Sequence, residues 1–178
     1  MESYAVFLRG INVGGINIKM ADLKAALTDY PFSKVKTLLA SGNVVLQSAL
    51  SAEKVKSEFE KCLRDAFAYD AWVVVLTAAQ VAGLVEACPY PADDKTTHSY
   101  VTLASDEAML EELYQAGAEL DGVDQVRLGP KAMAWLAPAG GTLDSPFSKL
   151  SSKARYKSGT TTRNLRTLIK VRDAAAAL

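Results

Sequence analysis

The sequence predicts an α+β protein built from two ferredoxin-like halves, the second of them incomplete, with an amphipathic helix at the C-terminus. Three observations predict this class. The first half has the element order βαββαβ, which is the split-βαβ pattern. The second half repeats the order βαββ. A chain of 178 residues with 49% hydrophobic side chains can also bury a sufficient core without disulfides or structural metal.

In the first half, short apolar runs predict strands at residues 4–11 and 72–76 and a hairpin of 35–39 with 44–47. Apolar residues at helical spacing predict helices from Met20 to Tyr30, where Pro31 stops the backbone ladder, and from Ser51, a plausible N-cap. Thr77 and Gln80 have capping-box spacing before a third helix that Pro89 ends.

In the second half, the pattern predicts a strand at 100–103, a helix at 106–115 closed by Gly117, and a hairpin at 126–136 that turns at Gly129-Pro130. A short helical turn at 145–151 and a helix from Thr162 follow, and no fourth strand is predicted. Residues 89–97 form the best linker. The predicted domains are therefore 1–88 and 98–178.

Charge is distributed unevenly along a chain whose net charge is zero. Residues 145–172 contain eight of the twenty basic side chains and no acidic one, whereas residues 86–124 contain ten carboxylates against Lys95 alone. Two interpretations stay open. The basic segment either contacts phosphates or pairs with the acidic middle of its own chain or of a second subunit.

Composition also bounds the compartment and the cofactors. No apolar run approaches the ~20 residues of a transmembrane helix, and the N-terminus lacks the features of a secretory signal, so we expect a cytoplasmic protein without membrane contact. Cys62 and Cys88 fall on apolar helix faces and are expected to be buried, reduced thiols. With His98 as the single histidine, the chain lacks donors for a zinc site, and we expect no metal and no cofactor.

Three blocks of sequence resemble one bacterial family. The first is FLRGINVGG at residues 7–15 with Asn17 and KMADL at 19–23, the second is SGNVV at 41–45, and the third is TTRN at 161–164 with Thr167. These blocks are similar to the signature of the uncharacterised family known as domain of unknown function 1697. The resemblance implies an α+β fold of two related ferredoxin-like halves and implies no particular activity.

The turn between the first strand and the first helix is the leading candidate for ligand binding. Backbone N–H groups and the helix dipole favour an anion at such a turn, although the residues match neither the Walker pattern nor a dinucleotide fingerprint. The alternative is a turn that the chain needs only for its conformation. The candidate residues here are Arg9, Asn12, Gly14, Gly15, Asn17 and Lys19.

Two further groups of residues are candidates. Ser41, Gly42 and Asn43 form either a hairpin turn or a ligand loop. We do not expect Ser41 to be a catalytic nucleophile, because a nucleophilic serine would need a neighbouring base. Thr162, Arg163, Asn164 and Arg166 begin the predicted terminal helix, on which Arg163, Arg166 and Lys170 form one cationic stripe.

These observations lead to three hypotheses about function. The first is a small cytoplasmic binding protein for a phosphorylated or other anionic ligand, or for nucleic acid. The second is a metal-independent enzyme whose site lies between the halves, with Arg9, Asn12, Asn43 and Arg163 around a pocket. The third is an interaction protein that forms a homodimer and binds no ligand.

Overall fold

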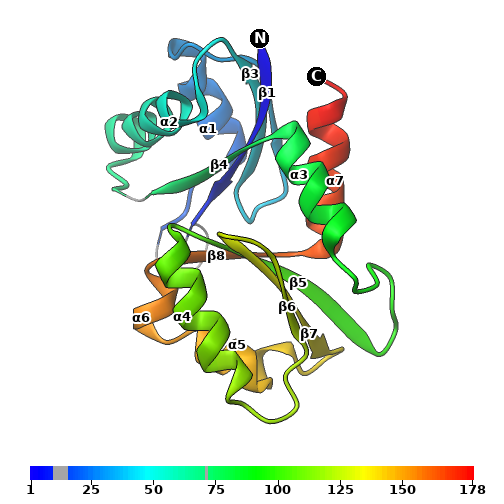
Figure 1. The fold of residues 1–178 in the computed structure, drawn as a ribbon. Coiled ribbons are helices and arrows are strands. Elements are labelled where there is room, and N and C mark those ends of the chain that lie inside the picture. The colour runs from blue at the N-terminus through cyan, green and yellow to red at the C-terminus, as the bar shows by residue number, and fades with distance from the viewer. Residues whose placement is uncertain (10–15, 71) are drawn as a thin grey trace. The chain divides into compact units, whose positions relative to one another are not determined.

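The computed structural model describes residues 1–9, 16–70 and 72–178 and confirms an α+β fold with two four-stranded antiparallel sheets (Figure 1). The chain divides into two compact units. Unit 1 comprises residues 1–82 together with 170–178, and unit 2 comprises residues 83–169. The domain boundaries predicted from the sequence, 1–88 and 98–178, stay a prediction.

Unit 1 contains sheet A, whose strand order is β2-β3-β1-β4. Its elements are β1 (Glu2–Leu8), α1 (Met20–Ala26), the 3-10 helix η1 (Leu27–Asp29), β2 (Ser33–Leu38), β3 (Asn43–Ser48), α2 (Ala52–Phe67) and β4 (Val73–Thr77). The helix α3 (Ala78–Ala87) begins in this unit and ends in unit 2. This order confirms the βαββαβ pattern.

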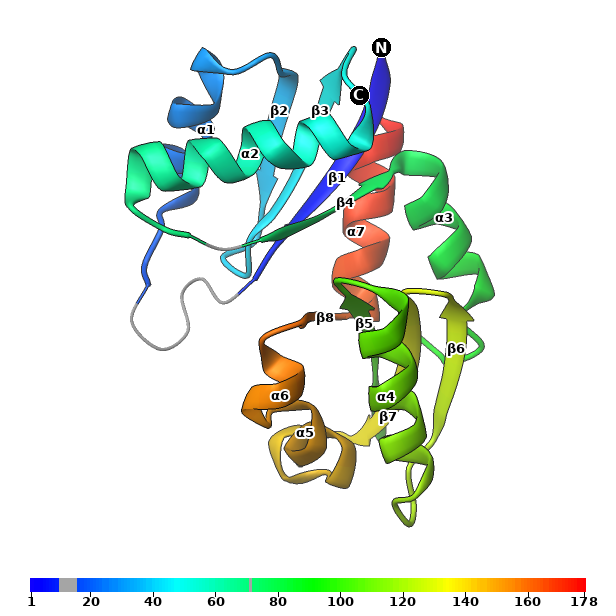
Figure 2. The ribbon, with the colours of Figure 1, turned by 60° about the vertical axis from the view of Figure 1, so that its left-hand side comes forward.

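The alternation of side chains along β1 explains how sheet A is buried. Tyr4, Val6 and Leu8 pack into one core cluster with Leu23 of α1 and Phe59 of α2. Figure 2 shows these two helices on the same side of the sheet. The intervening residues Ala5 and Phe7 are also fully buried, so both faces of the strand are covered.

Helices α2 and α3 begin directly after the capping residues that the sequence predicts, Ser51 and Thr77. The Ser51 side chain accepts a hydrogen bond from the Lys54 backbone N–H. Thr77 and Gln80 exchange reciprocal bonds of 2.9 and 3.1 Å, which is the capping box. Asp106, which the sequence pattern includes in the fourth helix, is instead the N-cap of that helix and accepts from the Met109 N–H at 2.8 Å. Each cap satisfies an N–H group that the helix itself leaves without a partner.

Unit 2 contains sheet B, whose strand order is β6-β7-β5-β8, the counterpart of the order in sheet A. Its elements are β5 (Thr97–Ala104), α4 (Glu107–Ala118), β6 (Gln125–Gly129), β7 (Ala132–Pro138), the 3-10 helix η2 (Thr142–Asp144), α5 (Pro146–Ser151), α6 (Ala154–Lys157) and β8 (Thr160–Asn164). The helix α7 (Leu165–Ala176) begins here and ends in unit 1.

Three expectations for the second half are wrong. A fourth strand exists, because the β-branched residues Thr160–Thr162 favour extended backbone and pair with β5. The terminal helix consequently begins at Leu165 and not at Thr162. Gly117 does not close α4 either, since the helix continues to Ala118. The hairpin turning at Gly129-Pro130 is confirmed by the pairing of β6 with β7.

A line of aromatic rings fills the core of unit 2. Trp135 on β7 lies between Tyr100 of β5 and Phe147 of α5, with both ring centroids 4.7 Å away. Trp135 also donates from Nε1 to the Thr102 hydroxyl at 3.0 Å. Leu110 and Leu113 of α4 complete this cluster. No helix in the described parts of the chain is long and apolar enough to cross a membrane.

Gly117 and Gly83 provide a matched pair of helical glycines. A Cβ on Gly117 would come within 2.2 Å of Gln125 Oε1 and 3.0 Å of the Phe147 ring, whereas a Cβ on Gly83 would meet nothing within 4 Å. We expect Gly117→Ala to lower the free energy of unfolding by about 1–3 kcal/mol through overpacking. Gly83→Ala should raise it by about 0.5–1 kcal/mol through helix propensity. Urea denaturation of both variants checks this, and equal shifts would contradict it.

Candidate functional site

The strand register of sheet A brings several predicted residues to one end of the sheet. Leu8, the last residue of β1, pairs with Val73, the first of β4, and its N–H donates to the Gly42 carbonyl at 2.9 Å. Arg9 therefore leaves β1 beside Trp72 and beside the turn before β3. We call the six residues here the β1-end cluster: Arg9, Ser41, Gly42, Asn43, Tyr69 and Trp72.

Arg9 is held at two points. Its guanidinium carbon lies 5.7 Å from the centroid of the Trp72 ring, within the range of a cation–π interaction. Its backbone carbonyl accepts a hydrogen bond from the Tyr69 hydroxyl. Tyr69 is buried, and this burial raises the pKa of its phenol. Arg9 and Trp72 are each half-buried.

The turn from Ser41 to Asn43 is held by the asparagine side chain. Asn43 is fully buried and donates from Nδ2 to the Leu38 carbonyl and to the Ser41 hydroxyl, each at 3.0 Å. Gly42 has a φ of 82°, a left-handed conformation that glycine adopts without strain. The amide of Asn43 thus builds the hairpin turn, while Ser41 lies exposed at the surface of the cluster.

The other candidate residues near the N-terminus are not part of the β1-end cluster. Asn12, Gly14 and Gly15 fall outside the described residues. Asn17 and Lys19 are exposed. Lys19 occupies the N-cap position of α1 but makes no side-chain capping bond there.

Arg163 lies on β8 and not on the terminal helix, which corrects the predicted cationic stripe. Its side chain is buried, with the whole residue 7% exposed. Nη1 donates to the Thr161 hydroxyl at 2.7 Å and to the Thr162 carbonyl at 2.9 Å. Burial lowers the pKa of the guanidinium to about 10, so Arg163 remains charged at neutral pH.

The remaining candidates of this block have structural partners. The Thr162 hydroxyl shares a hydrogen bond of 2.8 Å with that of Thr102. Asn164 caps α7, because its Oδ1 accepts from the Arg166 N–H at 2.9 Å. Arg166 itself is exposed. Arg163, Asn164 and Arg166 belong to unit 2, whereas Arg9 and Asn43 belong to unit 1.

The basic segment pairs with acidic residues at two positions. Arg155 of α6 forms an ion pair with Glu112 of α4, which belongs to the acidic middle of the same chain. Arg172 pairs with its neighbour Asp173 at 2.8 Å. Pairing within the chain therefore accounts for part of the basic charge. Four other cations of the segment are exposed lysines, at positions 149, 153, 157 and 170.

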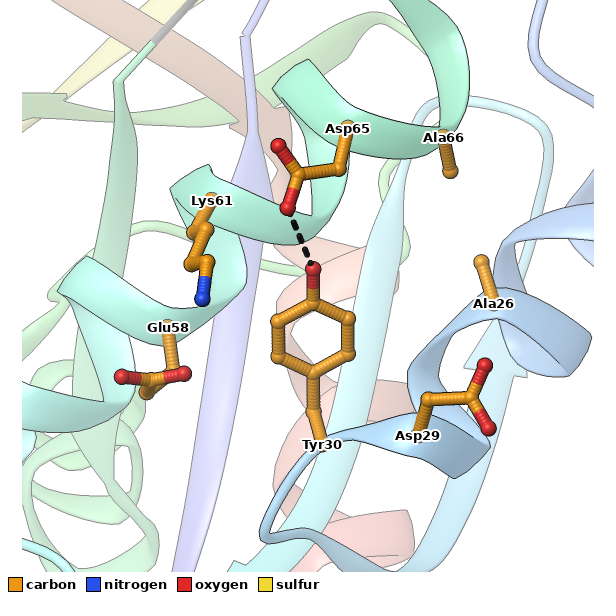
Figure 3. A pocket seen from close by; sticks show the side chains of 7 residues that line it. All are labelled: Ala26, Asp29, Tyr30, Glu58, Lys61, Asp65 and Ala66. Carbon is orange, nitrogen blue, oxygen red and sulfur yellow. Dashed lines mark hydrogen bonds between the residues drawn. The ribbon is translucent and has the colours of Figure 1, made fainter.

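A groove of about 460 Å³ that was not predicted from the sequence lies beside α2 in unit 1 (Figure 3). Asp29, Glu58 and Asp65 make it acidic, and Lys61 supplies one cation. The Tyr30 hydroxyl donates to Asp65 Oδ2 at 3.1 Å. The available signal was the spacing of Glu58, Lys61 and Asp65, which places all three on one face of a helix.

The Tyr30 phenol should make stability depend on pH. Desolvation and the hydrogen bond to Asp65 raise its pKa from 10.0 to about 12. A folded-state pKa above the unfolded value gives stability that is present below pH 10 and lost as the pH rises through 12. We expect Tyr30→Phe to reduce this alkaline loss, measured as the urea midpoint between pH 9 and 12. An unchanged pH profile would contradict the assignment.

The two cysteines differ in burial. Cys62 is a buried free thiol, as predicted, whereas Cys88 is a free thiol that is only half-buried. Burial raises the pKa of Cys62 to about 11 and raises that of Cys88 as well. Among the described residues, no group of three His, Cys, Asp or Glu side chains is arranged to hold a metal ion.

A family model described as "Protein of unknown function (DUF1697)" matches residues 1–133. The chain belongs to this family. The matched region contains the β1-end cluster and both N-terminal signature blocks. The DUF1697 match ends before β8, so Arg163 lies outside it. The resemblance predicted from the sequence is confirmed.

A solved structure shows the same fold. The conserved bacterial protein SP0830 from Streptococcus pneumoniae matches with a TM-score of 0.80 over 98% of each chain, at 21% sequence identity. At this identity the likeness concerns the fold alone. No curated protein matches the chain.

Proposed function

We propose that this DUF1697 protein binds a small anionic ligand, of the phosphorylated class, at the β1-end cluster. The observation that carries the proposal is the register of sheet A. It places Arg9, the turn at Ser41 and the indole of Trp72 at the adjacent ends of three strands. Polar groups on strand ends are held more rigidly than groups on long loops, which suits recognition.

The chemistry of the cluster fits an anion. Arg9 is its single charged side chain, and a guanidinium offers a planar fork of donors that matches phosphate or carboxylate. The cation–π contact with Trp72 restricts the motion of the guanidinium, so less side-chain entropy is lost when an anion binds. The Ser41 hydroxyl adds an exposed polar group, and the aromatic ring of Trp72 offers an apolar surface for the organic part of the ligand.

The proposal places the protein in the cytoplasm. Two free cysteines support this compartment, because reduced thiols persist where glutathione and thioredoxin act. The raised pKa values of both thiols give no support to an enzyme with a cysteine nucleophile.

The test uses Trp72 as an internal probe. The chain has two tryptophans, so a Trp135→Phe background leaves Trp72 as the only indole emitter. Inorganic phosphate, pyrophosphate and AMP are titrated while the emission is recorded. We expect saturable binding that Arg9→Ala weakens about 10–100-fold, because hydrogen bonds to charged groups contribute about 1.5–3 kcal/mol.

Arg64→Ala is the matched control. Arg64 lies in the same unit, is exposed and pairs with Asp70 at 3.8 Å, so its loss removes one positive charge outside the cluster. Arg9→Lys keeps the charge and loses the fork, and we expect intermediate affinity. The proposal fails if none of the three probes binds, or if Arg64→Ala weakens binding as much as Arg9→Ala.

A further inference from the structure

A pair of charged side chains on α2 contacts the edge strand β4 of sheet A. Lys56 and Glu60 lie one helical turn apart and form an ion pair. Both also bond to the backbone of Val73, the first residue of β4. Glu60 Oε1 accepts a hydrogen bond from the Val73 N–H at 2.9 Å, and Lys56 Nζ donates to the Val73 carbonyl at 3.1 Å. We call these two side chains the α2 clamp.

The α2 clamp takes the place of a neighbouring strand at Val73. In the sheet formed by the described residues, β4 is an edge strand, so one side of its backbone faces no further strand. Where Leu8 pairs with Val73, the Leu8 N–H points away from β4 and donates to the Gly42 carbonyl. The N–H and carbonyl of Val73 therefore also point outward, as in a non-hydrogen-bonded antiparallel pair. The α2 clamp satisfies both groups.

The α2 clamp acts directly beside the β1-end cluster. The N–H of Val73 belongs to the peptide unit that joins this residue to Trp72, and a peptide unit is planar. A hydrogen bond that holds this N–H therefore also holds the orientation of the backbone at Trp72. Trp72 directly precedes β4, as Arg9 directly follows β1, and the Arg9 guanidinium carbon lies 5.7 Å from the centroid of its ring.

Glu60 is the more buried member of the α2 clamp. Its side chain is 18% exposed, against 41% for that of Lys56. A carboxylate in such a place is costly unless it is paired and hydrogen-bonded, and Glu60 is both. Because Lys56 balances its charge, the clamp adds no net negative charge next to a cluster that we propose binds an anion.

We propose that Glu60 is a positioning residue of the anion site, which holds Trp72 against Arg9 through the N–H of Val73. As a statement about ligand binding, this inference rests on the function proposed above. Glu60 acts through the backbone and not by contact with the anion. It limits the orientations of the indole, so the binding groups lose less freedom when the ligand is bound. Lys56 supports this role by holding the carbonyl of the same residue.

The first measurement needs no ligand and follows Trp72 emission in the Trp135→Phe background. Acrylamide quenching reports how far solvent reaches the indole. We expect Glu60→Ala to raise the quenching constant and to shift the emission to longer wavelength, because the Val73 N–H loses its acceptor. Glu60→Gln keeps an Oε1 acceptor and should restore both values. Circular dichroism establishes that each variant folds.

Glu58→Ala is the matched control. Glu58 lies on the same helix, is half-buried like Glu60 and lines the groove beside Tyr30, so this change removes a carboxylate that does not bond to Val73. The second measurement is AMP binding by calorimetry. We expect Glu60→Ala to weaken it about 2–10-fold, the effect of one more side chain that must be ordered on binding. In a Trp72→Ala background the same change should weaken binding no further.

Three results would overturn the inference. The first is a quenching constant that Glu60→Ala leaves unchanged or that Glu58→Ala raises equally. The second is Glu60→Gln quenched as strongly as Glu60→Ala, which would exclude the route through the Val73 N–H. The third is unchanged AMP affinity in Glu60→Ala. If AMP and the other two probes do not bind the unchanged chain, the proposed function fails, and the quenching constants still decide whether Glu60 positions Trp72.

Discussion

Replacing Phe59 with alanine will lower the free energy of unfolding of unit 1 by about 3–5 kcal/mol, the cost of removing a buried phenyl ring and leaving a cavity. Phe59 on α2 is fully buried and lies in the core cluster formed with β1 and α1. Its ring centroid is 6.2 Å from that of Phe32, so the change also removes an aromatic contact. The Phe59 ring thus packs between helix α2 and sheet A.

Urea denaturation followed by Trp72 emission in a Trp135→Phe background measures this loss within unit 1. Phe67→Ala is the control, because Phe67 ends the same helix and is only half-buried. We expect it to cost less than half as much. A loss below about 1 kcal/mol for Phe59→Ala would show that the neighbouring side chains collapse into the space, and would contradict the packing described.

Replacing Phe147 with alanine will destabilise unit 2 by a similar amount, about 3–5 kcal/mol. Phe147 is 1% exposed and its ring lies 4.7 Å from Trp135, at the end of the aromatic line that begins at Tyr100. The loss should be visible in the near-ultraviolet circular dichroism of Trp135 in a Trp72→Phe background, since the indole will lose one of its two aromatic neighbours.

Leu143→Ala is the control for this change, because Leu143 is 84% exposed in the same unit and should shift stability by less than about 0.5 kcal/mol. A double variant adds a second check. The Phe147 ring is one of the groups that a Cβ on Gly117 would approach, at 3.0 Å. Gly117→Ala should therefore cost less when Phe147 is already alanine, and strictly additive losses would contradict this coupling.

Sequence reasoning succeeded where structure depends on neighbours along the chain. The caps at Ser51 and Thr77 use side chains within three residues of the N–H groups that they satisfy. The hairpin turn at Gly42 depends equally on local backbone conformation. Such interactions need no knowledge of the fold, and the element order of the first half could be read from them.

It failed where a long-range contact decides the outcome. The segment 160–164 is a strand because it pairs with β5, about sixty residues earlier, and no local pattern records that partner. The sequence pattern predicts a helix from Thr162, which puts Arg163 on an exposed helical face. Extended backbone turns it the other way, beside buried Val101 on the neighbouring strand.

The candidate site was predictable in part. Arg9 and Asn43 follow and begin paired strands, so their proximity could be inferred once β1 and β3 were known to pair. The position of Trp72 was also predictable, since it begins the predicted strand 72–76, and the strand β4 that follows it pairs with β1. Tyr69 had none, because its approach to Arg9 depends on how the chain leaves α2 in a left-handed turn at Ala68.

Unit 1 is assembled from two separate stretches of chain, residues 1–82 and 170–178, and this has a consequence for biosynthesis. The ribosome makes the intervening residues 83–169 before it makes the last piece, whose Leu178 carbonyl accepts a hydrogen bond from Lys34. At about 5–20 residues per second, that interval lasts roughly 4–17 s. During that interval residues 1–82 lack the partner segment 170–178, whereas unit 2 is made from one continuous stretch of chain.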